Sequence, residues 1–239
     1  MTIDGGSVVS NVTMTGGMLT QVTGTGANWK NGGGAYVADG TISWCCITNN
    51  ATLNGNCNYG GGVFMKKGQI DHSIIADNHV TSSSGTEAYG GGISIRDNSS
   101  VLIDKCLVYG NSAINNGHAG SGGGIGFDAQ ASGSITIRDT TIAGNSAGDG
   151  TSVAHGGAIY SNSGNQPTMY NCVISGNTTA GTNATVSLKN SAGVDYCLFD
   201  ISEDAIGEHS LVCNPVFVNP TDGDYRLGSG SAEIGRAHV

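Results

Sequence analysis

The stretch Asp104-Lys-Cys-Leu-Val-Tyr-Gly-Asn111 decides the fold, because it recurs in looser form at intervals of about thirty residues. The other copies are Trp44-Cys-Cys-Ile-Thr-Asn-Asn50, His72-Ser-Ile-Ile-Ala-Asp-Asn78, Asp139-Thr-Thr-Ile-Ala-Gly-Asn145, Asn171-Cys-Val-Ile-Ser-Gly-Asn177 and the shorter Tyr196-Cys-Leu-Phe-Asp200. Aligned, the copies give a column of small residues (Cys45, Ser73, Cys106, Thr140, Cys172, Cys197), an apolar column (Ile47, Ile75, Val108, Ile142, Ile174, Phe199) and an Asn column (Asn50, Asn78, Asn111, Asn145, Asn177). A repeat of this period is typical of a solenoid, in which each repeat packs only on its neighbours.

Each repeat also contains a pair of glycines followed by alternating apolar residues. The pairs begin at Gly33, Gly61, Gly91, Gly123 and Gly156, so the period grows through 28, 30, 32 and 33 residues. Apolar side chains at every second position turn one face of a strand inward. Between the Asn column and the next glycine pair, a segment of variable length is expected to leave the coil and return, which a solenoid tolerates at little cost.

Three short strands are predicted in each repeat, for example Ile93-Ser-Ile95, Val101-Leu-Ile103 and Cys106-Leu-Val108. A polar corner at Asp104-Lys105 separates the last two, and a turn at Gly110-Asn111 ends the third, since both residue types tolerate a left-handed backbone. No helical periodicity is visible. The sequence therefore predicts an all-β, single-stranded parallel β-helix of about six to seven coils. Like residues would then stack about 4.8 Å apart, and the Asn side chains would bond along their column.

Composition restricts the function. The chain has 239 residues, of which only 11% are charged, and its net charge is −9. No basic patch is present, so nucleic acid and anionic membrane surfaces are not expected as partners. No apolar run approaches the length of a membrane span in this segment.

The seven cysteines do not fit a disulfide framework, because their number is odd and several occupy the repeat column. We interpret them as buried thiols that fill space as small apolar groups. Cys172 and Cys197 would lie on neighbouring coils, so a disulfide between them is geometrically allowed but not required. Ser73 and Thr140 would bury hydroxyls in the same column, and we expect backbone carbonyls to accept their protons.

The two ends lead us to expect a fragment of a longer protein. The chain opens in the middle of a repeat, without the features of a signal peptide. We assign residues 1–200 to the β-helix repeats, 201–232 to a closing segment and 233–239 to a non-native tail, which resembles a translated sequencing adapter. The uncapped first coil exposes a strand edge, which favours self-association.

Two motifs resemble known families. The pairing of Gly156-Gly-Ala-Ile159 with Ile142-Ala-Gly-Asn145 is similar to the Gly-Gly-Ala-Ile and Phe-x-x-Asn repeats of polymorphic outer membrane proteins, and more broadly to right-handed β-helix proteins of the pectate-lyase-like superfamily. The segment Asn214-Pro-Val-Phe-Val-Asn-Pro220 with Asp224-Tyr-Arg-Leu227 resembles the closing segment of secreted bacterial β-helix proteins. The resemblance implies a right-handed coil and an extracellular or cell-surface location, but it is unspecific for activity.

A first set of candidate site residues follows the glycine pairs. The outward positions of the first strand are expected to stack as Tyr36, Phe64, Ser94, Gly126 and Ile159, and the next ones as Ala38, Lys66, Arg96, Asp128 and Ser161. Related enzymes work on this face with acidic calcium ligands and a basic residue, so Lys66, Arg96 and Asp128 are the candidate catalytic residues. The alternative is an exposed ion pair of Arg96 and Asp128, worth about 0–1 kcal/mol. We find no cluster of acidic residues for calcium and no neighbouring pair of Asp residues.

Aromatic side chains form a second candidate set. Tyr36 and Phe64 would provide a platform for a sugar ring, unless a loop covers them. Trp44 lies at a corner and is either covered by a loop or part of a sugar-binding surface. It stands beside a second outward column (Ser43, Asp71, Asp104, Arg138, Tyr170), which we interpret as a solvated edge.

We therefore expect a secreted or cell-surface bacterial β-helix protein that acts as an adhesin or a glycan-binding or structural stalk, without an assembled active site or cofactor. Its expected partner is a polysaccharide or a host or cell-surface glycan. The alternative is a polysaccharide lyase or glycoside hydrolase acting on the first-strand face, and only that alternative involves calcium.

Overall fold

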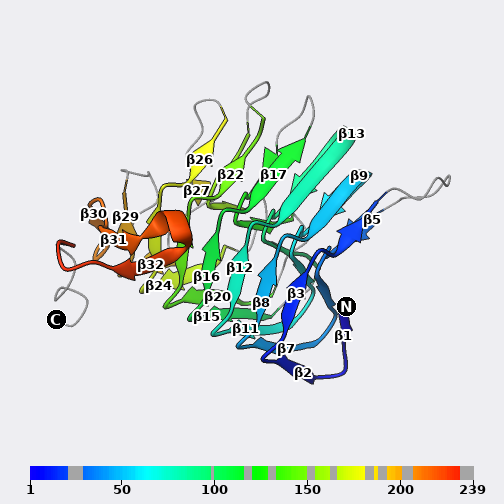
Figure 1. Ribbon diagram of the computed structural model, residues 1–239, viewed down its shortest axis with the longest axis horizontal. Helices are drawn as coiled ribbons and strands as arrows, with labels where there is room; N and C mark the ends of the chain where they lie inside the picture. Colours follow the sequence, from blue (N-terminus) through cyan, green and yellow to red (C-terminus); the bar gives the residue numbers. More distant parts are fainter. Residues whose placement is uncertain are drawn as a thin grey trace.

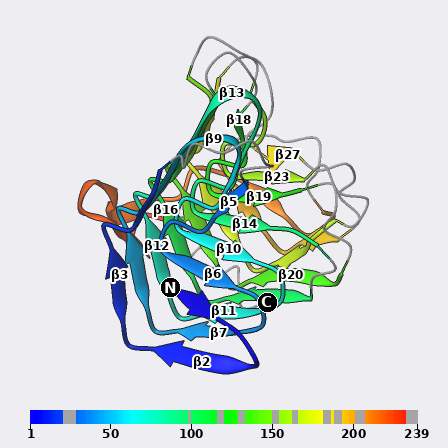
Figure 2. The same ribbon diagram turned by 90° about the vertical axis from the view of Figure 1, so that its right-hand side faces the viewer.

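The computed structural model describes residues 1–20, 29–97, 100–115, 120–128, 133–149, 154–161, 166–180, 186–187, 193–200 and 207–231, with residues 29–30, 54–57 and 83–87 described by their backbone alone. Within these ranges the chain winds into a stack of coils, and successive strands of each sheet come from successive coils (Figure 1). All strand pairs in the four large sheets are parallel (Figure 2). The predicted parallel β-helix is confirmed.

Two sheets hold the first and second strand of each coil. The first sheet is β1 (Thr2–Ile3), β6 (Ala35–Val37), β10 (Val63–Met65), β14 (Ile93–Ile95), β19 (Ile125–Phe127), β23 (Ile159–Ser161) and β27 (Val186–Ser187). The second sheet is β2 (Ser7–Ser10), β7 (Gly40–Ser43), β11 (Gly68–Asp71), β15 (Val101–Asp104), β20 (Ile135–Arg138), β24 (Thr168–Tyr170) and β28 (Val194–Asp195).

The third sheet holds the strand that follows the second corner. It is β3 (Thr13–Thr15), β8 (Cys46–Thr48), β12 (Ile74–Ala76), β16 (Leu107–Tyr109), β21 (Thr141–Ala143), β25 (Val173–Ser175), β29 (Leu198–Phe199) and β30 (Leu211–Val212). In the described residues this sheet has one more strand than the first two, because β30 comes from the closing segment. With seven strands in each of the first two sheets and eight in the third, the coil count of the described residues differs slightly from the six to seven predicted.

A fourth sheet was not predicted. It is β4 (Met18–Leu19), β9 (Ala51–Tyr59), β13 (His79–Tyr89), β17 (Ser112–Asn115), β22 (Ser146–Ala147) and β26 (Thr178–Thr179), with β5 (Trp29–Asn31) paired to β9 and β18 (Gly120–Ser121) paired to β13. These strands form from the variable segment after the Asn column, and they project beyond the other three sheets (Figure 2). The segment leaves the coil as predicted, but it remains paired with its copies above and below.

The interior is filled by columns of like residues. Ile47, Ile75, Val108, Ile142 and Ile174 follow one another in register across the third sheet, and each is at most 1% exposed. The hydroxyls of Ser73 and Thr140 donate to the carbonyls of Asp71 and Arg138, both at 2.7 Å, so the expected backbone acceptors are confirmed. Cys172 and Cys197 are buried free thiols, so no disulfide joins them.

Left-handed residues form the corners of each coil. In the central coil they are Gly90 (φ 66°), Asp97 (φ 69°), Lys105 (φ 50°) and Gly110 (φ 64°). The predicted left-handed turn is confirmed at Gly110, but the backbone of Asn111 is not left-handed. The side chain of Asn111 instead forms a hydrogen bond to the next coil. At the second corner the left-handed position holds residues other than glycine, which cost about 1–2 kcal/mol each in isolation. The bonds between coils hold these corners in place.

The Asn side chains form a continuous buried ladder. The amide Nδ2 of Asn78 donates to Oδ1 of Asn111 at 3.0 Å, and that of Asn111 donates to Oδ1 of Asn145 at 2.9 Å. Each Oδ1 also accepts a backbone N–H, such as that of Asn78 at 3.0 Å. Each Nδ2 also donates to a backbone carbonyl, such as that of Ile75 at 2.9 Å. The predicted bonding along the Asn column is confirmed.

The register of one repeat differs from the prediction. Ile159 pairs with Ile125 and points inward, so Tyr160 occupies the outward position above Gly126 that was expected for Ile159. Ser161 pairs with Phe127 and also points inward, not beside Asp128. The shift arises because Gly156, with φ 59°, is the left-handed corner glycine of its coil rather than the first of the packing pair.

The closing segment folds back on the third sheet. An antiparallel pair, β31 (Phe217–Asn219) and β32 (Asp224–Leu227), is joined by the short 3-10 helix η1 (Pro220–Asp222). The ring of Tyr225 lies 5.2 Å from that of Tyr109, centroid to centroid, and contacts Phe217 edge-on. The hairpin therefore covers part of the outer face of the third sheet (Figure 1). In the described residues, no helix is long and apolar enough to cross a membrane.

Replacing Asn111 by Ala should markedly destabilise the stack. The substitution leaves the amide and the backbone N–H of Asn78 without their acceptor, and each buried polar group left unpaired costs about 1–3 kcal/mol. Urea unfolding followed by circular dichroism measures the effect. The control Thr168→Ala, at an exposed outward position on β24, should stay within about 0.5 kcal/mol. Equal midpoints for the two variants would contradict the ladder.

The inward column also predicts which thiols react. Burial raises the pKa of Cys106 to about 12, and the thiolate is the reactive form. Iodoacetamide at mildly alkaline pH should therefore modify the half-buried Cys213 and leave Cys106 unmodified in the folded protein. Peptide mass spectrometry reads each site, with urea-unfolded protein as the control. Cys106 reacting as fast as Cys213 would show that its side chain does not face the interior.

Candidate functional site

The first-sheet face places its three charged candidates differently from expectation. Lys66 forms an exposed ion pair with Asp97, with Nζ and Oδ2 2.8 Å apart. Arg96 instead pairs with Asp128, with Nε and Oδ2 3.0 Å apart. The backbone places these residues on successive coils, because the N–H of Arg96 bonds the carbonyl of Met65.

The Arg96–Asp128 pair is buried, so the expectation of an exposed ion pair is wrong. Arg96 is 4% exposed and Asp128 is 5% exposed. The guanidinium carbon of Arg96 lies 4.9 Å from the centroid of the Tyr59 ring, at the returning end of β9. The fourth sheet, which the sequence did not predict, therefore supplies this cover. Both residues are therefore largely withdrawn from the surface, and Tyr59 lies over Arg96.

The same cover encloses the expected aromatic platform. Tyr36 and Phe64 do stack, with centroids 5.3 Å apart and an interplanar angle of 17°. Phe64 is only 1% exposed, however, because Tyr59 packs on it edge-on. Tyr89, from β13, continues the cluster by stacking on Tyr59. Phe64 thus belongs to a small aromatic core, and the half-buried Tyr36 and Tyr160 pack at its edge.

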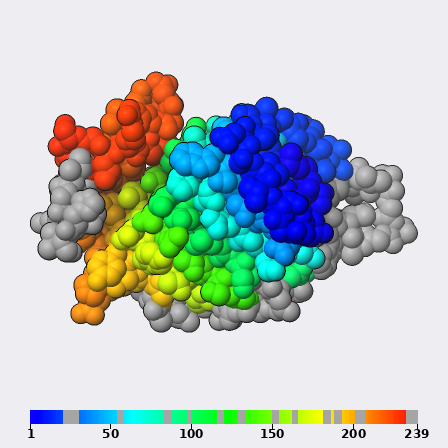
Figure 3. Space-filling model, turned by 90° about the horizontal axis from the view of Figure 1, so that it is seen from below, coloured from blue at the N-terminus to red at the C-terminus, as the bar shows by residue number. Residues whose placement is uncertain are grey.

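The second sheet, in contrast, has an open outer face. A shallow groove of about 430 Å³ crosses the starts of its strands, and it is lined by Gly6, Asp39, Gly40, Thr41, Gly68, Gln69, Ser100, Val101, Leu102, Ser134 and Thr136. Consecutive coils meet this face as neighbouring bands, from blue to orange (Figure 3). The groove therefore runs across several coils, and its lining is polar apart from Val101, Leu102 and the glycines.

Beside the groove runs a line of polar side chains in register, which we call the polar row: Ser43, Asp71, Asp104, Arg138, Tyr170 and Asp195. Asp71 is 8% exposed and accepts hydrogen bonds from Ser43 Oγ, from Gln69 Nε2 at 2.7 Å and from His72 Nδ1 at 3.0 Å. Burial acts to raise the pKa of Asp71, but these donors hold it below its ordinary value. Asp71 is therefore charged at neutral pH.

The other half of the polar row depends on Arg138. Its Nη2 donates to Oδ2 of Asp104 at 2.8 Å, and its Nη1 donates to the hydroxyl of Tyr170 at 3.3 Å. Asp104 is 5% exposed, and its second oxygen, Oδ1, is buried without a hydrogen-bond partner. Asp71 and Asp104 are also in register on adjacent strands. The statement that the chain lacks a neighbouring pair of Asp residues is therefore wrong.

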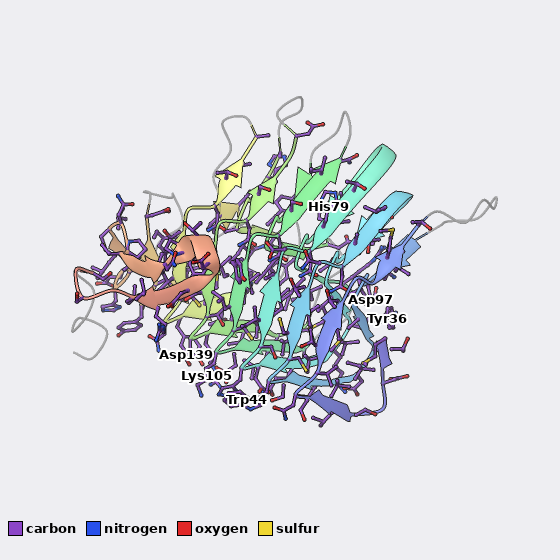
Figure 4. All side chains as sticks on the ribbon, in the orientation of Figure 1. Tyr36, Trp44, His79, Asp97, Lys105 and Asp139 are labelled. Carbon is purple, nitrogen blue, oxygen red and sulfur yellow. The ribbon has the colours of Figure 1, made fainter. Side chains whose placement is uncertain are left out.

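Trp44 is the most exposed candidate. It stands on the corner next to the polar row and is 61% exposed, so the expectation of a covering loop is wrong. One face of its ring stacks on His72, with centroids 4.3 Å apart and an interplanar angle of 16°. Trp44 belongs to a line of left-handed corner residues, the corner ridge: Asn11, Trp44, His72, Lys105, Asp139, Asn171 and Tyr196. Figure 4 shows Trp44, Lys105 and Asp139 along one edge of the molecule.

The sequence predicted two features of this face, the column of polar residues and the corner residue Trp44, but it did not predict that a groove lies beside them. The polar row was recognised as a column, yet its carboxylates are buried rather than solvated. The groove could not be predicted, because its shape depends on how the strand starts are spaced. In the described residues, no three His, Cys, Asp or Glu side chains gather closely enough to hold a metal ion.

If the Arg96–Asp128 pair is structural, removing one partner should destabilise the fold. Arg96→Met leaves a buried carboxylate without its cation, which costs about 3–5 kcal/mol. The double variant Arg96→Met with Asp128→Leu should recover most of that loss, since it removes both charges. Thermal unfolding of the wild type, of Arg96→Met, of Asp128→Leu and of the double variant gives the coupling. A double variant no more stable than Arg96→Met alone would argue against a structural pair.

Comparisons with known proteins bear on the fold rather than the site. A family model described as a right handed beta helix region matches residues 4–195, which is more than half of the chain. Searches of curated proteins and of solved structures each found no match. Together with the parallel sheets described above, the family match gives the handedness of the coil. The chain belongs to the right-handed β-helix family.

Proposed function

We propose that this chain is a glycan-binding part of a secreted or cell-surface adhesin or stalk, and that the outer face of the second sheet is its binding surface. The observation that carries the proposal is the exposure of Trp44 beside the groove. An exposed indole face provides the apolar surface on which a sugar ring stacks, while its edge remains polar. The corner geometry and the His72 stack hold this ring in one orientation.

The rest of the face supports the same function. Thr41, Gln69 and Thr136 line the groove with hydroxyl and amide groups, and these both donate and accept hydrogen bonds. Gln69 is held by its bond to Asp71, so part of the groove is fixed before any ligand binds. A preorganised polar surface reduces the entropy lost on binding. The low content of charged residues, 11%, also suits a surface that meets neutral sugar hydroxyls.

The alternative, a polysaccharide lyase or hydrolase on the first-sheet face, receives less support. Its two central residues, Arg96 and Asp128, are 4% and 5% exposed. A group that does not contact the substrate cannot transfer a proton to or from it. The exposed Lys66 is held in an ion pair with Asp97, and it does not share that surface with the buried Arg96 and Asp128.

Replacing Trp44 by Asn should abolish or strongly reduce glycan binding. Asn tolerates the left-handed backbone, and it occupies the same corner position at Asn11 and Asn171, so the change removes the ring without straining the coil. Binding to a glycan array, followed by calorimetry on any positive ligand, measures the loss. Stacking of one ring accounts for roughly 1–3 kcal/mol, or about a five- to hundredfold change in Kd.

The matched control for this experiment is Tyr196→Asn. Tyr196 is 58% exposed and occupies the same corner ridge, but it lies on a coil beyond the groove. Its substitution should leave binding unchanged. Wild-type protein that binds no glycan, or a Trp44→Asn variant that binds as tightly as the wild type, would refute the proposal.

A further inference from the structure

We infer that Cys172 and Cys197 are a modification site, at which a low-molecular-weight disulfide oxidises two facing thiols to a disulfide bond between neighbouring coils. The inference goes beyond glycan binding and does not depend on it. It starts from the column of small residues that follows the corner ridge, because this column decides which thiols face each other. In the structure both thiols are free, so the bond defines a second, oxidised state.

Register places the two cysteines opposite each other. Val173 pairs with Leu198 on the parallel strands β25 and β29, and Cys172 and Cys197 stand one residue earlier on each. The carbonyl of Cys172 accepts the N–H of Leu198 at 2.8 Å, which fixes this alignment. Both side chains belong to the core and are 1% and 2% exposed. Their Cα atoms are therefore about one strand spacing apart, about 4.8 Å, and a disulfide spans about 4.4–6.8 Å.

The other cysteines of this column do not face a second thiol. Ser73 separates Cys45 from Cys106, and Thr140 separates Cys106 from Cys172. Cysteines two coils apart are about 9.6 Å apart, and a disulfide does not form where the Cα distance exceeds about 7 Å. Among the described residues, the column therefore contains one pair that can be oxidised, and Cys45 and Cys106 are controls of similar burial.

The two thiols differ in acidity. The side chain of Cys172 lowers the pKa of Cys197 through a hydrogen bond between the two thiols, although burial acts to raise it. Burial raises the pKa of Cys172, and the hydrogen bond to Cys197 adds to that rise. The thiolate is the form that attacks a disulfide. Cys197 is therefore the attacking thiol, and Cys172 is the thiol that completes the bond.

The end of the column gives a reagent access to Cys197. The N–H of Cys197 donates to Ser210 Oγ at 3.1 Å, so Ser210 continues the column into the closing segment. In the described residues, the strand that follows is the two-residue β30, whose Leu211 and Val212 are 36% and 46% exposed. Short, exposed strands open locally at low free energy. Opening of β30 exposes Cys197 first, whereas Cys172 lies one coil deeper.

The reaction with a small disulfide, RSSR, proceeds in two exchanges. The Cys197 thiolate attacks RSSR, forms a mixed disulfide and releases RS⁻. Cys172 then loses its proton and attacks Cys197 Sγ, which forms the bond between the coils and releases a second RS⁻. The two released thiolates take up the two protons that the protein thiols lost. Two protein thiols are thus oxidised, and one RSSR is reduced to two RSH.

The bond ties β25 to β29 near one end of the described stack. The Cβ atoms of a disulfide are about 3.8 Å apart, so the two strands must approach by about 1 Å at this step. The short β30 offers little resistance to that movement. Each coil of a solenoid contacts only the coils beside it, so a stack opens from its ends. Because a disulfide restricts the unfolded chain between its cysteines, oxidation should slow the opening of this end.

The test uses the Cys213→Ser chain, because Cys213 and Cys197 otherwise share one tryptic peptide, residues 190–226. The folded protein is incubated with oxidised glutathione, alkylated with iodoacetamide in urea and digested with trypsin. Mass spectrometry should find the Cys172 and Cys197 peptides joined, with two hydrogen masses lost. In the oxidised protein, hydrogen exchange at the amide of Leu198 should be slower by about tenfold.

Two variants test the order of attack, with circular dichroism to confirm that each is folded. Cys172→Ala should keep glutathione on Cys197 as a stable mixed disulfide, because no second thiol displaces it. Cys197→Ala should leave Cys172 free of glutathione. Glutathione on Cys172 in the second variant, without glutathione on Cys197 in the first, would contradict the inference.

The unsubstituted cysteines decide the rest. Cys172 and Cys197 that are both alkylated after incubation of the folded protein would overturn the inference. A bond between Cys45 and Cys106 in equal yield would also overturn it, because that bond requires an unfolded chain. Neither result affects glycan binding through Trp44, so the proposed function is tested separately.

Discussion

The amide ladder is the interaction on which the rest of the structure depends. From Asn50 to Asn177 each side chain donates to the one on the next coil, over distances of 2.9–3.0 Å in a buried column. A buried amide that slips by one residue leaves donors and acceptors unpaired on two coils at once. The ladder also explains the glycine landmark. A side chain at Gly92 would lie 3.0 Å from the amide of Asn111, so the neighbouring strand can approach only without one. Ladder and glycines together fix the register of successive coils.

Fixed register has a consequence for the surface. Because equivalent residues lie above one another, every outward position forms a column, and the chemistry of the face is decided by which residues a column contains. A repeat that places Asp at the same position on two coils necessarily creates a like-charge contact, as at Asp71 and Asp104. The neighbouring side chains moderate it: Ser43, Gln69 and His72 supply donors to one carboxylate, and Arg138 neutralises the other. The charge pattern of this face is thus a direct product of stacking.

The sequence predicted the columns well, because like residues at a constant offset are visible without knowledge of the coil. The prediction failed where the spacing between equivalent residues changes, and where a residue is buried by a segment outside its own column. At Tyr160 the predicted register was wrong by one residue, because Gly156 is the left-handed corner glycine equivalent to Gly122, and Ala158 replaces the second packing glycine. The burial of Arg96 depends on Tyr59, which belongs to a segment whose length varies between repeats and which shows no regular alternation. The exposure of Trp44 depends on the absence of cover, and a single sequence gives no pattern for that. Contacts within a column could be predicted, whereas contacts between a column and a variable segment could not.

The position of the open face follows from where the chain makes its connections. At the second corner one left-handed residue, such as Trp44 or Lys105, turns the chain from the second sheet to the third, so this corner itself contributes no segment that covers either strand. The long segments all leave after the Asn ladder, and the returning ends of β9 and β13 place Tyr59 and Tyr89 over the first sheet. The closing hairpin covers part of the third sheet through Tyr225 and Tyr109. The second sheet therefore keeps the groove over its strand starts open to solvent across several coils. Under the proposed function, contact with a glycan therefore falls to the residues that line this groove, rather than to the charged residues enclosed above the first sheet.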